Sequence, residues 1–321
     1  MKKVFLTLVI AGVCLLILGG TVFTIAMAKA GWDFSELSNL VYEEKTFEIA
    51  ADEISEISAS VNTEDVSFVF SEDEKIRLTY FDKFDKKGNA VSVYAAEASD
   101  GVLTLKQTRV KRSFTDMDFG KSKKLVIAVP EGKKLALTLK VSTGHVALGA
   151  EGKSLAFTSL SLKTSTGAIC LAGAITSDED VTLETHTGAI RVGAELTATG
   201  TIRCKASTGD IKITRPVTAK KLECEASTGD IKIEASASAE SVECKTDTGI
   251  VKVSASLSAN AVTVRSDTGD VSLLLAGKKE DYSCVLTTDT GSVSPRSYTG
   301  GDKRVDIDVD TGDISVRFAQ E

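Results

Sequence analysis

The sequence predicts an all-β protein: a parallel β-solenoid (β-helix) of about nine rungs of 20–23 residues, preceded by an N-terminal β cap and an N-terminal transmembrane helix. Three observations support this prediction. Nine Thr-Gly pairs recur at intervals of 20–23 residues, apolar and polar residues alternate on both sides of each of these pairs, and the chain begins with a long segment free of charge. Repeats of 20–50 residues are typical of solenoids, in which each unit stacks on the next.

The first element is the apolar segment of residues 4–28, which has no charged side chain and follows Lys2 and Lys3. A membrane-spanning helix needs about 20 apolar residues, whereas the apolar part of a cleaved signal peptide has about 7–15. We therefore expect residues 1–30 to form a retained, single-pass anchor in the cell membrane. The two lysines place the N-terminus in the cytoplasm and the body outside. Ala26-Met27-Ala28 leaves a cleaved signal peptide as the alternative.

Residues 31–45 are expected to form a juxtamembrane linker, and residues 46–134 a β-rich N-terminal cap. Six segments of this cap alternate with period two, namely residues 54–60, 66–70, 76–80, 91–94, 102–106 and 125–129. Residues 62–68 resemble a degenerate copy of the later repeat. A solenoid needs such a cap to cover its first open rung.

Residues 135–321 are expected to be the solenoid itself. Its Thr-Gly glycines are spaced by 23, 21, 21, 20, 20, 20, 22 and 21 residues, and they are Gly144, Gly167, Gly188, Gly209, Gly229, Gly249, Gly269, Gly291 and Gly312. Apolar residues occupy the second and fourth positions after each glycine and alternate positions before it. This pattern predicts two strands per rung with inward rows of like residues. A weaker row eight residues after each glycine predicts a short third facet, and a hairpin meander is the structural alternative.

The composition argues against several functions. The net charge is −7 and the pI about 5.2, whereas a nucleic-acid binder needs a dense field of Lys and Arg. Aromatic residues make up only 6% of the chain, which is low for a protein that grips sugars or bases. Rungs of nearly equal length leave no loop for a catalytic cleft. His145 and His186 occupy turn positions and have no evident Ser, Cys or acidic partners. We therefore expect no enzyme, no cofactor and no small-molecule substrate.

The Thr-Gly-Asp turn contributes rows of carboxylates along one corner. The candidate calcium ligands are Asp210, Asp230, Asp270 and Asp313, joined by Asp247, Asp267, Asp289 and Asp310 two residues before the glycines. Calcium prefers several carboxylate and carbonyl oxygens. Asp and Thr are also common turn residues because they bond neighbouring backbone amides. We expect no resident metal and keep calcium as the alternative.

A basic stretch precedes the repeats. Its members, Arg109, Lys111, Arg112, Lys121, Lys123 and Lys124, are candidates for contact with anionic wall polymers or lipid headgroups. Within the repeats, Lys212, Lys232 and Lys252 are expected to be mixed with Glu223, Glu225 and Glu243 on one charged surface.

The cysteines of the repeats are expected to be structural. Cys204, Cys224 and Cys244 share one inward row, with Cys284 on a neighbouring row, and small thiols pack well in a core. Cys170 lies three residues after its glycine, so it should face outward as a partly covered free thiol.

The layout resembles the bacterial putative-adhesin family of β-strand repeat proteins, including LiaG-like membrane-anchored members. The resemblance rests on the apolar anchor, residues 57–70, residues 125–132 and the Ser-Thr-Gly-Asp-Ile-Lys-Ile units. It implies a non-enzymatic cell-envelope protein that binds or adheres, or that senses envelope stress, and it brings no catalytic residues. The expected partners are the membrane and cell-wall polymers or a membrane signalling partner. A polysaccharide-active β-helix enzyme and a self-assembling scaffold, which would use an exposed C-terminal rung, are the alternatives.

Overall fold

The computed structural model describes residues 2–29, 31–32, 38, 40–110, 123–150 and 152–320. The chain divides into two compact units, one made of residues 1–44, 81–93 and 109–122, the other of residues 45–80, 94–108 and 123–321. Each unit is described separately below. Strands β1 (Leu40–Ala50), β4 (Lys75–Asp85), β5 (Ala90–Ser99) and β6 (Val102–Arg109) contribute residues to both.

The first unit contains helix α1 (Lys2–Lys29) and an antiparallel hairpin at the ends of β4 and β5, in which Lys83 pairs with Ser92. Asp85 closes the hairpin turn by accepting hydrogen bonds from the backbone N–H groups of Lys87 and Asn89, both at 2.8 Å. Across the described part of the chain, no helix combines the length and the apolar character needed to cross a membrane.

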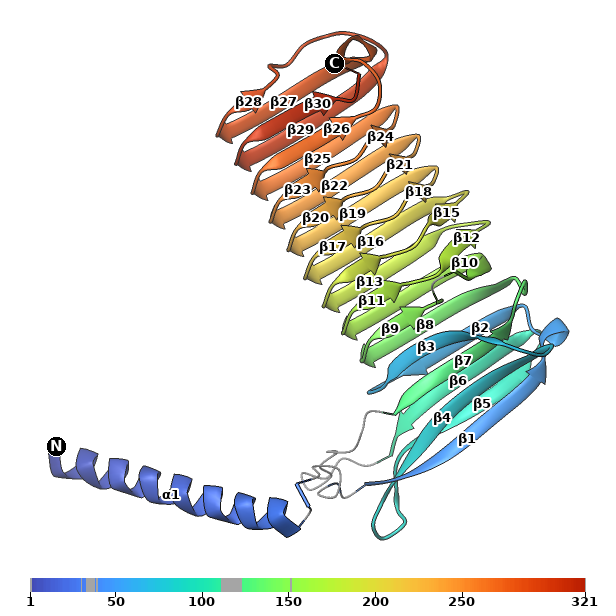
Figure 1. Cartoon of the computed structure of the whole chain (residues 1–321), viewed down its shortest axis with the longest axis vertical. Coiled ribbons are helices and arrows are strands. Elements are labelled where there is room, and N and C mark those ends of the chain that lie inside the picture. The colour runs from blue at the N-terminus through green and yellow to red at the C-terminus, as the bar shows by residue number, and fades with distance from the viewer. Residues whose placement is uncertain are drawn as a thin grey trace. The chain divides into compact units, whose positions relative to one another are not determined.

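The second unit is a parallel β-solenoid, as the sequence predicts, and its strands stack in register along three facets (Figure 1). The long-strand facet carries the strand that precedes each Thr-Gly corner. In spatial order it consists of β6, β2 (Glu56–Val61), β8 (Leu135–Thr143), β10 (Ser154–Thr166), β13 (Val181–Thr187), β16 (Thr201–Thr208), β19 (Lys221–Thr228), β22 (Ser241–Thr248), β25 (Ala261–Thr268), β29 (Lys303–Thr311) and β27 (Tyr282–Thr290).

The short-strand facet carries the strand that follows each corner. It consists of β7 (Lys124–Pro130), β3 (Asp65–Ser71), β9 (Val146–Leu148), β11 (Ile169–Leu171), β14 (Ile190–Val192), β17 (Ile211–Ile213), β20 (Ile231–Ile233), β23 (Val251–Val253), β26 (Val271–Leu275), β30 (Ile314–Phe318) and β28 (Val293–Ser294). The predicted third facet is confirmed as β12 (Ala174–Ser177), β15 (Leu196–Ala198), β18 (Val217–Thr218), β21 (Ala237–Ser238) and β24 (Leu257–Ser258). Short 3-10 turns complete the unit at Ala51–Glu53 and Lys279–Asp281.

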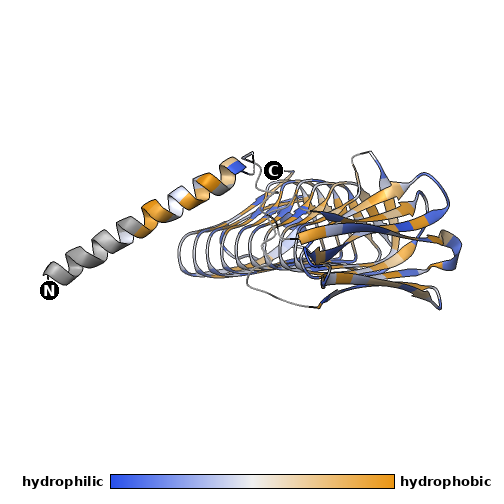
Figure 2. Ribbon diagram, turned by 90° about the horizontal axis from the view of Figure 1, so that it is seen from below, coloured by the Kyte–Doolittle hydropathy of each residue, from blue (hydrophilic) through white to orange (hydrophobic). Residues whose placement is uncertain are grey.

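The core lies inside the rungs and is built from the predicted inward rows. Ile190, Ile211 and Ile231 stack directly on one another and are fully buried. Along each strand, apolar and polar residues alternate, as the orange and blue segments of Figure 2 show. A slip of one residue would move a whole inward set to the solvent, so the alternation fixes the register. The pairing between successive rungs is parallel, which excludes the hairpin meander.

The order of rungs in space departs from the order in sequence at both ends. Residues 303–318 insert between the rung that ends at Leu275 and the rung of residues 282–294, because β29 pairs with both β25 and β27 (Figure 1). At the other end, β2 and β3 lie between β6 and β7 on one side and β8 and β9 on the other. The C-terminal rung is therefore not the outermost one, as the self-assembling-scaffold alternative would require. The same rearrangement leaves Val293 only partly buried, because its rung is outermost.

Both ends of the solenoid are closed by non-parallel pairing. At the N-terminal end β4 pairs antiparallel with β7, where Leu78 faces Ile127. At the C-terminal end the segment after β28 folds over the edge of β27: Cys284 and Tyr298 exchange backbone hydrogen bonds of 2.9 and 3.0 Å. The Ser297 hydroxyl accepts from the Leu286 N–H (2.9 Å) and donates to the Leu286 carbonyl (3.1 Å). Open strand edges invite further pairing, and these contacts block that route.

The parallel ladder reaches back to residues 56–71, 102–106 and 124–130, so residues 62–68 do follow the pattern of the repeat: Val66 pairs with Val146 and Phe68 with Leu148. The domain boundaries at residues 30, 45 and 134 stay predictions.

Candidate functional site

The Thr-Gly corner is a stack of close backbone contacts. Gly229 has φ of +148°, and a Cβ added there would lie 2.3 Å from the carbonyl oxygen of Gly209. The same contact recurs at Gly249 with the Gly229 carbonyl, at 2.1 Å. A side chain fits neither the dihedral nor the space, so the repeated glycine is a requirement of rung stacking.

Where an aspartate follows the corner glycine, its side chain connects neighbouring rungs. The Asp230 N–H donates to Asp210 Oδ1 and the Ile250 N–H donates to Asp230 Oδ1, both at 2.9 Å. Asp270 accepts from the Asp313 N–H at 2.9 Å, and Asp313 accepts from the Ser292 N–H at 2.7 Å. Each of these four calcium candidates thus uses one carboxylate oxygen to bond an amide of the neighbouring rung, which supports the interpretation of the four as turn residues.

These contacts lower the pKa of two of the carboxyl groups. For Asp230 the first cause is the hydrogen bond from the Ile250 amide, followed by the one from Lys232. For Asp313 the causes are the hydrogen bonds from the backbone amide and the hydroxyl of Ser292. In the described residues no group of three or more His, Cys, Asp or Glu side chains is arranged to hold a metal ion. Calcium dependence stays an open prediction.

Three of the cysteines form a buried stack. Cys204, Cys224 and Cys244 pair in register on successive rungs, and each is at most 1% exposed. Hydrogen bonds with Cys204 and Cys244, together with burial, raise the pKa of the Cys224 thiol well above its usual value. All three are free thiols, as is the buried Cys284. They pack as core residues, and a thiol with a raised pKa is a poor nucleophile or metal ligand.

The histidines differ from the prediction in one respect. His145 accepts a hydrogen bond from the Ala168 N–H at its Nδ1 (2.9 Å), so it takes the place of an aspartate at the corner. His186 does have a serine partner, since its Nδ1 lies 3.0 Å from the Ser207 hydroxyl beside a hollow of about 280 Å³. Sequence reasoning missed this pair because its members lie 21 residues apart in sequence.

Charges on the outer surface of the long-strand facet are matched between rungs. Ion pairs join Lys163 to Glu184 (2.6 Å), Lys205 to Glu225 (2.8 Å), Arg203 to Glu223 (2.5 Å), Lys221 to Glu243 (3.0 Å) and Arg265 to Asp306 (3.0 Å). The predicted mixing of these glutamates with Lys212, Lys232 and Lys252 is wrong. Those lysines lie on the short-strand facet, because the Thr-Gly corner turns the chain between the two.

The short-strand facet carries a row of cations that we call the basic ladder: Arg191, Lys212, Lys232 and Lys252, paired in register on four consecutive rungs. Lys212 is ion-paired with Glu234 (2.9 Å) and Lys232 with Asp230 (2.6 Å). Arg191 and Lys252 make no ion pair with any residue that the structure describes. In the sequence these cations can be recognised as the residues that stand three positions after successive Thr-Gly glycines.

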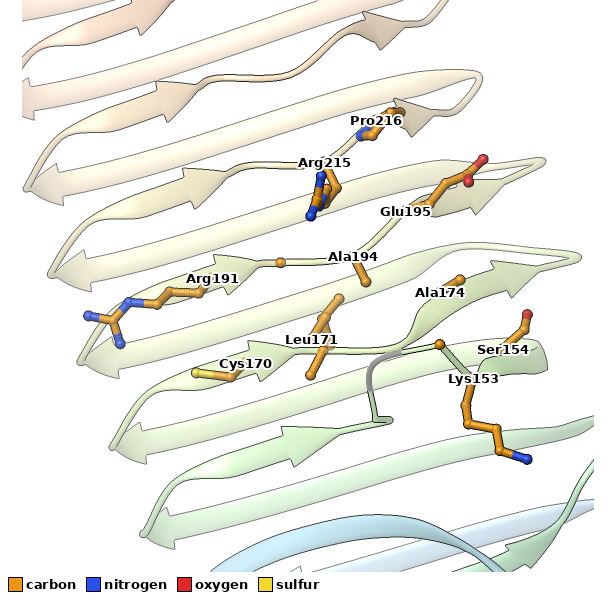
Figure 3. A pocket seen from close by; sticks show the side chains of 13 residues that line it. Lys153, Ser154, Cys170, Leu171, Ala174, Arg191, Ala194, Glu195, Arg215 and Pro216 are labelled. Atoms are coloured by element: carbon orange, nitrogen blue, oxygen red, sulfur yellow. The ribbon is translucent and has the colours of Figure 1, made fainter.

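A groove opens beside the first rung of the basic ladder. Its volume is about 730 Å³, and it is lined by Cys170, Ala194, Gly193, three cations (Lys153, Arg191 and Arg215) and one carboxylate, Glu195 (Figure 3). Gly193 leaves space there, because the equivalent positions of the next two rungs carry the bulkier Thr214 and Glu234. Cys170 faces outward as predicted and is partly exposed. It pairs in register with Arg191, so the thiol extends the column by one rung.

The basic stretch predicted before the repeats is only partly visible. Lys111, Arg112 and Lys121 lie outside the described residues. Arg109, Lys123 and Lys124 are exposed at the end of β6 and the start of β7, and Arg109 belongs to the first unit whereas the lysines belong to the second. A shared binding surface for these six residues stays a prediction.

Comparison with known proteins gives the family. The family model Toastrack DUF4097 matches residues 54–321. This chain belongs to the Toastrack DUF4097 family. The predicted resemblance to a family of putative adhesins is confirmed. No curated protein matches the chain.

Several solved structures are similar to this Toastrack chain. One is a putative adhesin from Bacteroides fragilis, at 14% identity and a TM-score of 0.41, over 85% of this chain and 97% of that one. Another is a putative lipid binding protein from Parabacteroides distasonis, at 14% identity and a TM-score of 0.42, over 87% and 97%. A third is a putative adhesin from Parabacteroides merdae, at 12% identity and a TM-score of 0.39, over 84% and 96%. The solenoid fold of this Toastrack chain is established by its own strand pairing.

Proposed function

We propose that this chain is a non-enzymatic protein of the cell envelope whose solenoid binds a surface or a polymer. The observation that carries the proposal is the unbroken register of the rungs, which stacks equivalent outward positions in rows along each facet. Parallel rungs lie about 4.8 Å apart, so a facet offers a row of regularly spaced contacts. Membership of a family with putative-adhesin relatives supports the proposal.

The proposal includes attachment to the cell membrane by residues 4–28, with the solenoid outside the cytoplasm. It is supported by the charge-free sequence of that segment and by the two lysines before it. An alkaline carbonate wash of membranes, combined with the intact mass of the isolated chain, tests it. Retention in the pellet at full mass is expected, and release into the wash with loss of the N-terminal residues would favour a cleaved signal peptide.

Binding is tested by sedimenting the purified full chain with isolated cell wall and, separately, with anionic liposomes, each with calcium or with a chelator. Saturable binding is expected. Loss of binding on neutralising Lys111, Arg112, Lys123 and Lys124 would locate it in the basic stretch, and loss with the chelator would assign a role to the aspartate corner. No binding under any condition would refute the proposal, and release of sugar fragments from the wall would favour an enzyme.

A further inference from the structure

We infer that the basic ladder and its groove bind a linear polyanion, a polymer bearing phosphate or carboxylate groups, laid along the short-strand facet. The inference rests on the proposed binding function, and it adds the class of ligand and the place where it lies.

The geometry of the ladder suits a linear partner. Arg191, Lys212, Lys232 and Lys252 occupy the same outward position of four stacked strands. At about 4.8 Å per rung, their Cα atoms form a line about 14 Å long that runs across the strands. The residues at the two ends of this line, Cys170 and Ser272, are uncharged. The row of cations is thus one side chain wide and four rungs long.

Half of the cations in this row lack the ion pairs that most cations of the long-strand facet make. There, lysines and arginines are joined to carboxylates of neighbouring rungs, as in Lys205 with Glu225. Arg191 and Lys252 of the ladder, and Arg215 in the turn between β17 and β18, make no ion pair with the residues that the structure describes. Lys212 and Lys232 are paired, but their side chains are 43% and 34% exposed. Exposed ion pairs contribute about 0–1 kcal/mol, so an incoming anion can displace them.

The groove provides a binding site for one anionic group at the Arg191 end of the ladder. Three cations line the groove against one carboxylate, Glu195, and Arg215 lies on the rung that follows Arg191 (Figure 3). A guanidinium bonds phosphate or carboxylate with two parallel N–H donors. The groove of about 730 Å³ holds a larger group than the flat rungs beyond it.

The shape of the charged row favours a polymer over a membrane. A membrane presents anionic headgroups over two dimensions and rewards a broad basic patch. The corner beside the ladder is acidic instead, with Asp210 and Asp230 next to Lys212 and Lys232. Those carboxylates would repel a broad anionic surface, whereas a thin chain along the ladder avoids them.

The test compares two triple variants of the full chain in neutral phosphatidylcholine nanodiscs. The ladder variant is Arg191→Gln, Lys252→Gln and Arg215→Gln. The control is Lys163→Gln, Lys205→Gln and Lys245→Gln, which removes the same charge from outward positions of the other facet. The probes are poly(glycerol phosphate), poly(glutamic acid), inorganic phosphate, neutral dextran and vesicles containing phosphatidylglycerol. Circular dichroism checks that both variants keep the fold.

We expect both polyanions to bind the natural protein and the control, with the ladder variant about 100-fold weaker, since each cation near an anionic partner contributes about fivefold. The slope of log affinity against log salt should fall by about two to three units for the ladder variant. Inorganic phosphate should bind far more weakly than either polymer. Preference between the polymers identifies the anionic group.

Cys170 gives an independent readout, because it is partly exposed at the end of the ladder. Bound polyanion should slow its alkylation, mapped by peptide mass, while dextran should not. Equal polymer affinity in the ladder variant and the control would overturn the inference, and so would tighter ladder-dependent binding of vesicles than of polymers. If the natural protein still binds isolated wall in those cases, the proposed function survives. If it binds neither wall nor any probe, both fail.

Discussion

Replacing Gly229 by alanine tests whether the glycine column holds the rungs at their spacing. The added Cβ would lie 2.3 Å from the Gly209 carbonyl oxygen, whereas such contacts essentially never fall below 3.0 Å, so the rungs must separate locally by about 0.7 Å. Two hydrogen bonds between these rungs, Gly209 N–H to Thr228 O and Ile211 N–H to Asp230 O, both at 2.8 Å, would then stretch to the limit of useful length.

Two weakened hydrogen bonds at about 1 kcal/mol each, and about 1 kcal/mol for alanine at a positive φ, give a loss near 3 kcal/mol. Urea unfolding followed by circular dichroism measures it. The matched control is Gly132→Ala, where φ is +80° and nothing lies within 4 Å of the added Cβ. The control should lose only about 1 kcal/mol, the cost of the dihedral. Equal losses in the two variants would refute the argument from rung contact.

Three further predictions follow from individual contacts. Because the pKa of Asp230 is lowered in the folded state, its carboxylate stabilises the fold above its ordinary pKa near 3.8, and this contribution is lost as pH falls through and below that value; Asp230→Asn should therefore lose less stability than the natural protein between about pH 6 and pH 3 in urea titrations. Ser297→Ala leaves the Leu286 N–H and carbonyl at the edge of β27 without their hydroxyl partner, so light scattering should detect end-to-end dimers, and a strictly monomeric variant would contradict the edge-closing role. Iodoacetamide should modify Cys170 at least about tenfold faster than Cys224 in the folded protein, since burial and a raised pKa protect the Cys224 thiol. If Cys224 were modified at similar rates before and after unfolding in urea, the result would count against the buried stack.

The repeat rungs could be predicted from the sequence because their information is local. The inward rows, for example Ile190 above Ile211, follow from period-two alternation around a fixed glycine, and the structure buries them as expected. The order of rungs at the ends could not be predicted in this way. The rung of Gly312 carries the same alternation as its neighbours, and the alternation is equally compatible with a place beside Gly269 or beside Gly291.

Surface charge was harder to predict than the core, for a related reason. Lys212 and Glu225 both read as outward residues, but a corner separates them and places them on different facets. The alternation within one strand shows which side chains face outward, whereas an ion pair depends on which strand of the neighbouring rung lies beside that strand. Lys205 pairs with Glu225 because the two residues, 20 positions apart in sequence, lie opposite each other on neighbouring strands. Ion pairs of this kind can be predicted only once the strand pairing is known.

The in-register stacking of the rungs determines both the strand pairing at the two ends of the solenoid and the row of cations in the basic ladder. Stacking identical positions creates a row of like side chains, which is favourable for Ile in the core and unfavourable for Lys on the surface, where like charges repel. The long-strand facet relieves that repulsion by alternating sign between rungs, as in Lys163 and Glu184. The short-strand facet keeps four cations in succession. Only two of these four cations, Lys212 and Lys232, have an ion partner among the described residues, so the repulsion that remains at Arg191 and Lys252 is where an anionic partner would gain most by binding.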